Sequence, residues 1–245
     1  MAIYGSVGSP DQRSASMRLY LLGGFELQCD GHSVATTFAA QRLLAFLALQ
    51  SRRLRRLYVA GVLWPDVSEQ RSVGSLRSAL WRLGHLEYRL VDSDSETIRL
   101  SPTVRVDVQD VGLCASRLLS SPSIEASDVA LMTAGGELLP DQYDEWVLIE
   151  RERMRQLRFH ALEILCERLT TLGRYGQAIE VGLAAVNGEP LRESSHRSLI
   201  QVHLAEANVC EALRQFNRYR ELLRDELGIE PSQSLKQLLP ISCFE

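Results

Sequence analysis

The sequence has no apolar run of the roughly 20 residues that a helix needs to cross a bilayer. Its first residues, MAIYGSVGSPDQRSAS, lack the basic start and apolar core of a secretion signal. Their polar composition instead predicts a disordered leader over residues 1–16. These absences favour a cytoplasmic protein that makes no membrane contact.

The chemistry of common enzyme sites is also missing. The five cysteines are odd in number and form no C-x-x-C pair, which argues for reduced thiols and against a structural zinc site. There is no G-x-x-x-x-G-K-[ST] phosphate loop and no G-x-S-x-G nucleophile elbow. We therefore expect no enzymatic activity, no cofactor and no metal site.

What is present is a soluble-type composition with an uneven charge. A chain of 245 residues that is 45% hydrophobic has room for one or two domains with real cores. Residues 17–108 hold 12 Arg/Lys and 9 Asp/Glu, whereas the chain from residue 109 onward holds 14 and 21. A mildly basic first half beside an acidic second half fits one nucleic-acid module and one protein-contact module.

The first half begins with strand signals. Met17–Cys29 reads as strands broken by Gly23-Gly24, and the turn dipeptide Asp30-Gly31 leads into a returning strand. A strongly apolar helix is predicted over Ala39–Gln50. The domain is therefore expected to start with a small antiparallel sheet.

A helix–turn–helix is predicted between Leu57 and Leu86. Pro65 ends the first helix, because it biases the residue before it away from helical angles, and Ser68 is suited to cap the second. The second helix has an apolar stripe formed by Val73, Leu76, Leu80 and Leu83. Its opposite face carries Arg71, Gly74, Ser75, Ser78, Trp81 and Arg82. Such a face suits a helix in a DNA major groove, although many solvated helices also carry Arg and Ser.

Two flanking segments add to this picture. Ser51–Arg56 crowds four arginines into one connection, which is either a solvated basic loop or a set of phosphate contacts. Tyr88–Val91 and Thr97–Leu100 predict a hairpin in the position of a wing. Its tip holds Asp92, Asp94 and Glu96, and carboxylates repel phosphates.

The second half is predicted to be almost wholly helical. Helices are expected at Gln109–Leu119, at Ile124–Ala134 and, as one long helix, from about Asp144 to Leu172. Leu172–Ala178 then matches Glu206–Ala212 at a spacing of 34 residues. That period is typical of tetratricopeptide helix pairs, which stack and present a concave surface to a protein or peptide. The alternative is a purely structural bundle.

These features together resemble a known family of regulators. The first half resembles an OmpR-type winged helix, and more narrowly that of the Streptomyces antibiotic regulatory protein (SARP) family. The segments that carry this resemblance are Phe25–Leu27, Gln41–Leu49, Leu63–Asp66, Leu76–Leu83 and Val106–Val108. Further motifs resemble the family's bacterial transcriptional activator domain (BTAD): Leu138–Met154, Leu172–Ile179, Glu189–Ala207 and Glu226–Leu235. The resemblance spans roughly residues 17 to 240.

The resemblance implies a mainly α protein with two domains. Residues 17–106 would form an α+β winged helix-turn-helix, and residues 107–240 an all-α, tetratricopeptide-like activation domain. It also implies an activator that binds promoter repeats on double-stranded DNA, contacts RNA polymerase or a sigma factor, and pairs as a homodimer on DNA. Arg71, Ser75, Ser78 and Arg82 are expected to contact bases. Arg77 and Trp81 are expected to meet the DNA backbone or the protein partner. The expected phosphate contacts are Arg52, Arg53, Arg55 and Arg56.

Two other interpretations remain open. One is a tetratricopeptide adaptor whose winged helix docks protein, which the acidic second half and acidic wing tip would suit. An adaptor would tolerate Glu on the Arg71/Ser78/Arg82 face, whereas a DNA-binding protein would not. The other is a repressor, which shares the DNA chemistry and differs in where its site lies relative to the promoter.

Overall fold

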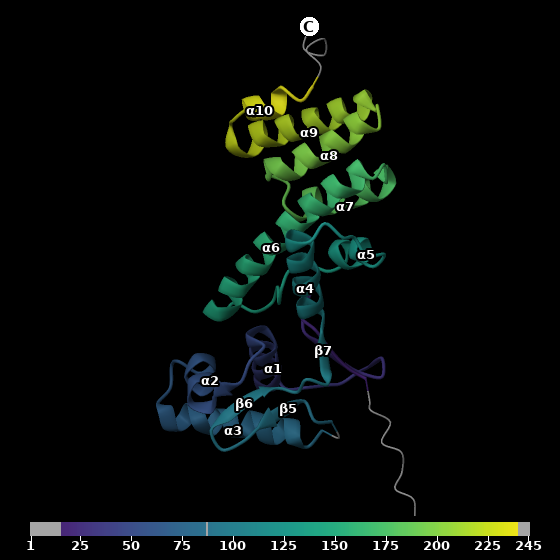
Figure 1. Ribbon diagram of the computed structural model, residues 1–245. Coiled ribbons are helices and arrows are strands. Elements are labelled where there is room, and N and C mark those ends of the chain that lie inside the picture. Colours follow the sequence, from purple (N-terminus) through teal and green to yellow (C-terminus); the bar gives the residue numbers. More distant parts are fainter. Residues whose placement is uncertain (1–15, 87, 240–245) are drawn as a thin grey trace, which may run out of the picture. The chain divides into compact units, whose positions relative to one another are not determined.

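A computed structural model describes residues 16–86 and 88–239. The chain divides into two compact units, each described here by itself (Figure 1). The first comprises Phe25–Val106 and the described residues up to Leu21, and the second comprises Leu22–Gly24 and the described residues from Asp107 on. In the described part of the chain no helix is long and apolar enough to span a bilayer.

The first unit opens with a four-stranded sheet in the order β3-β2-β1-β7. Its strands are β1 (Met17–Tyr20), β2 (Glu26–Cys29), β3 (His32–Ser33) and β7 (Val104–Val106). β1 pairs antiparallel with β2 and parallel with β7. Alternate residues face the core, as the pleat requires, so Leu19, Leu27 and Val106 are buried. The predicted small sheet is confirmed, although β7 adds a parallel edge.

Three helices and a second sheet complete this unit. The helices are α1 (Phe38–Gln50), α2 (Arg56–Leu63) and α3 (Glu69–Gly84). The hairpin strands β5 (Val91–Ser93) and β6 (Thr97–Leu100) are joined by β4 (Leu54–Arg55) into a sheet of order β4-β6-β5. Of the two interpretations of Ser51–Arg56, the solvated loop is wrong for its second half: Leu54 and Arg55 pair with the hairpin, and Arg56 begins α2.

The helix–turn–helix forms for local reasons. α2 ends at Leu63, and Trp64 leaves helical geometry before Pro65 with φ −134° and ψ 67°. Ser68 precedes α3 in extended geometry, but its side chain makes no capping hydrogen bond. The backbone N–H of Ser72 instead donates to the carbonyl of Ser68, 2.9 Å away.

The second unit consists of helices. Their bounds are α4 (Asp107–Ser120), α5 (Asp128–Thr133), α6 (Glu145–Thr171), α7 (Tyr175–Gly188), α8 (Glu193–Ala205), α9 (Val209–Leu227) and α10 (Gln233–Lys236). Successive long helices pack on one another from α6 to α9 (Figure 1). The expected helix over Ile124–Ala134 was too long, because Asp128 accepts the backbone N–H of Glu125 and closes a turn before α5 starts.

The 34-residue repeat corresponds to two equivalent helical hairpins, α6-α7 and α8-α9. Gly173 and Ala207 occupy matching positions in their turns, and both are left-handed, with φ of 70° and 63°. The same backbone bond closes each turn: Arg174 donates to Leu169 and Asn208 to His203. The predicted mainly α architecture, a winged helix-turn-helix with a tetratricopeptide-like helical unit, is confirmed.

The predicted leader lies outside the described residues except for its last one. Ser16 exchanges hydrogen bonds with Asp30: its N–H donates to Oδ1 at 2.8 Å, and its carbonyl accepts from the N–H of Asp30 at 3.1 Å. Strand β1 itself begins at Met17, the first residue after the predicted leader.

Candidate nucleic-acid interface

Helix α3 has one buried face and one exposed face. The residues fully buried on it are Ser72, Leu76, Ala79 and Leu83. Leu76 and Leu83 were predicted there, whereas Val73 and Leu80 are only half-buried. The buried face of α3 is therefore rotated from the predicted stripe toward Ser72 and Ala79. These two small residues allow close packing of the helix on the core.

This rotation changes which residues face outward. Arg71, Ser78 and Arg82 are exposed as predicted, whereas Ser75 is half-buried at the edge of the core. Arg77 and Trp81, predicted to flank the face, are exposed, and Trp81 leaves 66% of its surface accessible. Ser78 donates its hydroxyl to the carbonyl of Gly74, one turn earlier, at 3.1 Å.

The arginines of α3 are not neutralised by neighbours. Within residues 16–86 and 88–239, Arg71, Arg77 and Arg82 form no ion pair. Exposed guanidinium groups of this kind bind phosphates or the O6 and N7 atoms of guanine in a bidentate manner. The helix therefore carries its positive charge in a form available to an external anion.

Trp81 is held by its own helix. Its ring packs on that of His85 with centroids 3.9 Å apart, and Nδ1 of His85 lies 2.7 Å from the Trp81 carbonyl. These contacts orient a large aromatic surface that remains mostly exposed. Such a surface can pack on sugar or base edges, or on an apolar protein partner.

The basic connection and the acidic wing tip bind each other. Arg53 donates to Asp94 Oδ2 at 3.4 Å and to the Thr97 hydroxyl at 3.3 Å. Arg56 donates from Nη1 to the Ser93 hydroxyl at 2.9 Å and to the Asp94 carbonyl at 3.0 Å. Two of the four predicted phosphate-binding arginines are thus tied to the hairpin tip.

The other two arginines of the connection remain available. Arg52 and Arg55 are exposed, and neither forms an ion pair with any residue that the structure describes. The backbone of Arg55 is fixed by the pairing of β4 with β6, opposite Thr97. Its guanidinium is therefore carried on a sheet edge instead of a free loop.

Asp94 is a structural carboxylate at the hairpin tip. Its Oδ1 accepts the backbone N–H groups of Thr97 and Glu96 at 2.7 and 2.9 Å, and its Oδ2 accepts the Thr97 hydroxyl at 2.7 Å. The Thr97 bonds, followed by that from Glu96, lower the pKa of Asp94 to about 2. The carboxylate therefore stays ionised at neutral pH, and Arg53 partly compensates its charge.

A second carboxylate organises the base of the hairpin. Asp92 lies opposite Arg99 in the β5–β6 register and accepts its Nε and Nη2 at 3.1 and 3.0 Å. Its other oxygen lies 3.0 Å from Nε of Arg89. Both hairpin arginines are therefore bound to one nearly buried acid, which orders the strand entering the hairpin.

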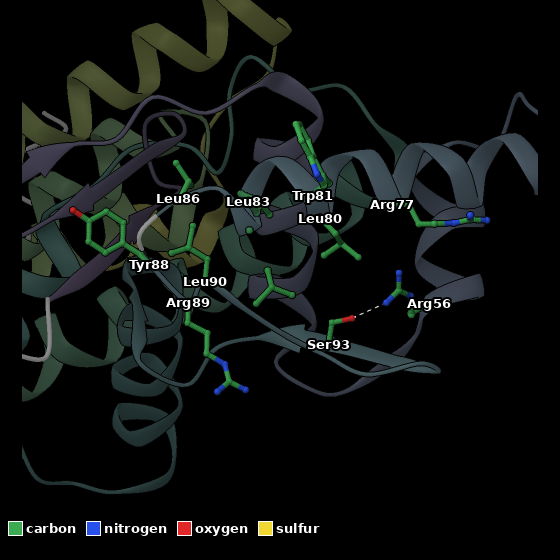
Figure 2. A pocket seen from close by; sticks show the side chains of 12 residues that line it. Arg56, Arg77, Leu80, Trp81, Leu83, Leu86, Tyr88, Arg89, Leu90 and Ser93 are labelled. Atoms are coloured by element: carbon green, nitrogen blue, oxygen red, sulfur yellow. Dashed lines mark hydrogen bonds between the residues drawn. The ribbon is translucent and has the colours of Figure 1, made fainter. Parts of the chain in front are cut away.

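A groove of about 660 Å³ separates α3 from the start of the hairpin (Figure 2). Its lining includes basic side chains from three elements: Arg56 from α2, Arg77 from α3 and Arg89 just before β5. Trp81 also lines the groove, as do leucines such as Leu80 and Leu90. Of the predicted site, the structure brings Arg56, Arg77 and Trp81 together here.

The remaining predicted residues lie outside this groove. Arg82 lines a smaller hollow with Thr36, Thr37 and His85, and Arg71, at the start of α3, lines neither. Sequence reasoning missed the pairing of Arg53 with Asp94 and the place of Arg89 in the groove. The acidic tip was itself the available signal, because four arginines in a neighbouring connection are the expected partners for it.

The two units define a class of protein in which a winged helix-turn-helix is combined with stacked helical hairpins. Residues 119–239 match the family model of the bacterial transcriptional activator domain. The predicted relationship to SARP and BTAD regulators is confirmed.

Two relatives extend this finding. Over 240 residues the chain is 25% identical to Regulatory protein AfsR of Streptomyces coelicolor, a match that covers 93% of this chain and 24% of that protein. It also resembles the solved structure of Mycobacterium tuberculosis EmbR in complex with a low affinity phosphopeptide, with a TM-score of 0.66 and 21% identity. That match covers 93% of this chain and 66% of the other, and it establishes the fold. The chain spans about a quarter of AfsR and two thirds of EmbR.

Proposed function

We propose that the chain is a sequence-specific DNA-binding transcriptional activator. The observation that carries the proposal is the exposed face of α3, where Arg71, Arg77 and Arg82 have no acidic partner among the described residues. A major groove admits one helix, and unpaired arginines there bind guanine edges and phosphates. The match of residues 119–239 to the model of the bacterial transcriptional activator domain supports the same role.

The contacts divide by chemistry. Arg71, Ser78 and Arg82 are proposed to read base edges, with Ser75 at the margin of the contact because it is half-buried. Arg77 and Trp81 meet the sugar–phosphate backbone beside the groove that the hairpin borders. Arg52 and Arg55 bind phosphates directly, whereas Arg53 and Arg56 first order the hairpin tip.

The helical unit is the proposed protein-contact module. Stacked hairpins of tetratricopeptide type present surfaces to other proteins. In an activator the protein partner of this unit is RNA polymerase or a sigma factor. Two copies of the chain would also pair with each other on repeated DNA sites. Both partners are part of the proposal.

Selection from a random DNA pool, followed by titration with salt, tests the proposal. A repeated motif in the enriched pool, with log affinity falling steeply against log salt, would support base reading together with phosphate contacts. The double variant Arg71→Glu/Arg82→Glu should then lose the motif. Unchanged enrichment by that variant, or no binding at low salt, would favour a protein-docking role for the winged helix.

A further inference from the structure

The helical unit contains a cavity of about 760 Å³ between the loop that precedes α6, helices α6 and α7, and part of α4. Apolar side chains dominate its lining, among them Val111, Leu138, Met154, Phe159, Leu162, Leu183 and Ala184. Sites for small organic molecules have volumes of about 300–1,000 Å³, apolar walls and a few polar groups. This cavity has the size and lining of such a site.

One wall of the cavity depends on a glycine. A Cβ added at Gly188 would lie 3.0 Å from Cε1 and Cζ of the Phe159 ring. The ring therefore packs against bare backbone at the end of α7, and any side chain at 188 would displace it. The wall is closely packed, so the cavity is not simply a loose region of the fold.

Three arginines of α6 line the cavity, and two of them have carboxylate partners. Arg151 lies 3.3 Å from Glu137 and donates to the carbonyls of Leu138 and Leu139. Arg155 pairs with Glu152 and with Glu189. The charges of these two side chains are therefore balanced within the unit.

Arg158 is different. Its Nε and Nη2 donate to the carbonyls of Met132 and Ala134, at 2.8 to 3.1 Å, and Nη2 lies 3.5 Å from that of Thr133. It forms no ion pair with any described residue, and its Nη1 has no hydrogen bond there. Burial lowers the pKa of Arg158, but a guanidinium remains charged in proteins.

A half-buried charge without a counter-ion has lost part of its hydration, and an anion beside it offsets that loss. We propose that this cavity binds a small apolar molecule that carries one anionic group, with the anion on Arg158 and the apolar body against Phe159 and Leu162. Glu180 also lines the cavity, is exposed and has no ion pair among described residues, so it opposes the anion from the rim. This site concerns the helical unit alone and does not depend on the proposed binding of DNA.

Two fluorescent probes of one shape test the proposal on the full chain. Anilinonaphthalene sulfonate carries an anionic group on an apolar body, and N-phenyl-1-naphthylamine is its uncharged parent. We expect one sulfonate probe per chain, bound about ten-fold more tightly than the uncharged one, as one charge-assisted contact implies. Arg158→Gln should remove that preference, whereas Glu180→Gln should strengthen binding of the sulfonate about two- to five-fold.

Two further variants separate the cavity from the rest of the surface. Ala184→Phe fills the cavity and should weaken both probes, whereas Arg153→Gln, on an exposed arginine of α6 paired with Glu150, should change neither. Thermal unfolding identifies any variant that fails to fold. If Arg158→Gln does not fold, binding of the two probes to Glu180→Gln and Ala184→Phe tests the proposal. Equal affinity of both probes for the parent chain, or unchanged binding in Ala184→Phe, would overturn the proposal.

Discussion

Arg53 and Asp94 are 41 residues apart in the sequence, and their side chains lie 3.4 Å apart between the basic connection and the hairpin tip. The pair is exposed, so salt screens it and its contribution to folding is small. The pair matters for DNA binding, because Asp94 competes with a DNA phosphate for Arg53 and Arg53 reduces the repulsion between Asp94 and the phosphate. Neutralising one partner should therefore change DNA affinity.

Asp94→Asn should raise affinity for DNA of any sequence. The change removes a negative charge from the tip and releases Arg53, which would add about one phosphate contact and make the slope of log affinity against log salt steeper by about 0.9. Binding to a non-cognate duplex at several salt concentrations measures this slope.

Glu96→Gln is the matched control for Asp94→Asn. It removes the same charge from the same tip, but the Glu96 side chain forms no ion pair in the described part of the chain. It should raise affinity slightly without the added slope. Equal slopes for the two variants would mean that the Arg53–Asp94 pair does not regulate phosphate contact.

Arg82→Ala should weaken binding to a selected cognate site by about 5- to 150-fold, as loss of a base-contacting arginine does. Binding to non-cognate DNA should fall much less, so the ratio of the two affinities is the quantity to measure. Arg105→Ala makes the same charge change on the exposed face of β7 and should leave the ratio unchanged. An unaltered ratio in Arg82→Ala would remove Arg82 from base recognition.

The order of elements was predictable because periodicity and turn residues act locally. Leu76 and Leu83 identified α3, and the spacing of 34 residues identified both helical hairpins. The exact orientation of α3 was not predictable, since a buried Ser72 looks like a surface residue in a hydrophobic pattern. The orientation of α3 depends instead on packing against the core, which needs small residues at the contact.

Contacts between distant segments were the other unpredicted part. The hydrogen bonds of Arg56 to Ser93 and Asp94 depend on β4 joining the hairpin sheet, and two residues are too few to be recognised as a strand in the sequence. The same holds for Arg158, whose partners are backbone carbonyls of a loop. Charge counts describe available groups but cannot assign their partners.

Ala207→Gly should stabilise the second helical hairpin. Ala207 has φ of 63°, a left-handed conformation that costs a non-glycine residue about 1 kcal/mol, and Gly173 occupies the equivalent turn without that cost. The new glycine also gives the unfolded chain more entropy, which offsets about 0.4 kcal/mol or more of this gain, so the free energy of unfolding should rise by up to about 0.6 kcal/mol. Gly173→Ala should produce the opposite change, and urea unfolding of both variants measures it.

His196 should make the helical unit less stable as pH falls from 7 to 5. Burial lowers the pKa of His196, and the neutral ring is held by the Pro190 carbonyl at Nε2 and the Gln215 amide at Nδ1, each 2.8 Å away. Below the unfolded pKa of about 6.5 the unfolded chain takes up a proton that the folded ring resists. The stabilisation contributed by the neutral His196 ring is thus fully present above about pH 6.5 and declines below it.

The contribution of His196 can be isolated by comparing variants. His196→Gln should lower stability at pH 7, because it loses the stacking of the ring on Tyr219, but should reduce the dependence on pH by up to about 1.4 kcal/mol per pH unit. His160→Gln, on an exposed histidine of α6, should leave the wild-type dependence in place. Urea unfolding at pH 7 and pH 5.5 provides both quantities. If His196→Gln kept the full pH dependence, the loss of stability in acid would have to come from other groups, because residue 196 would no longer titrate.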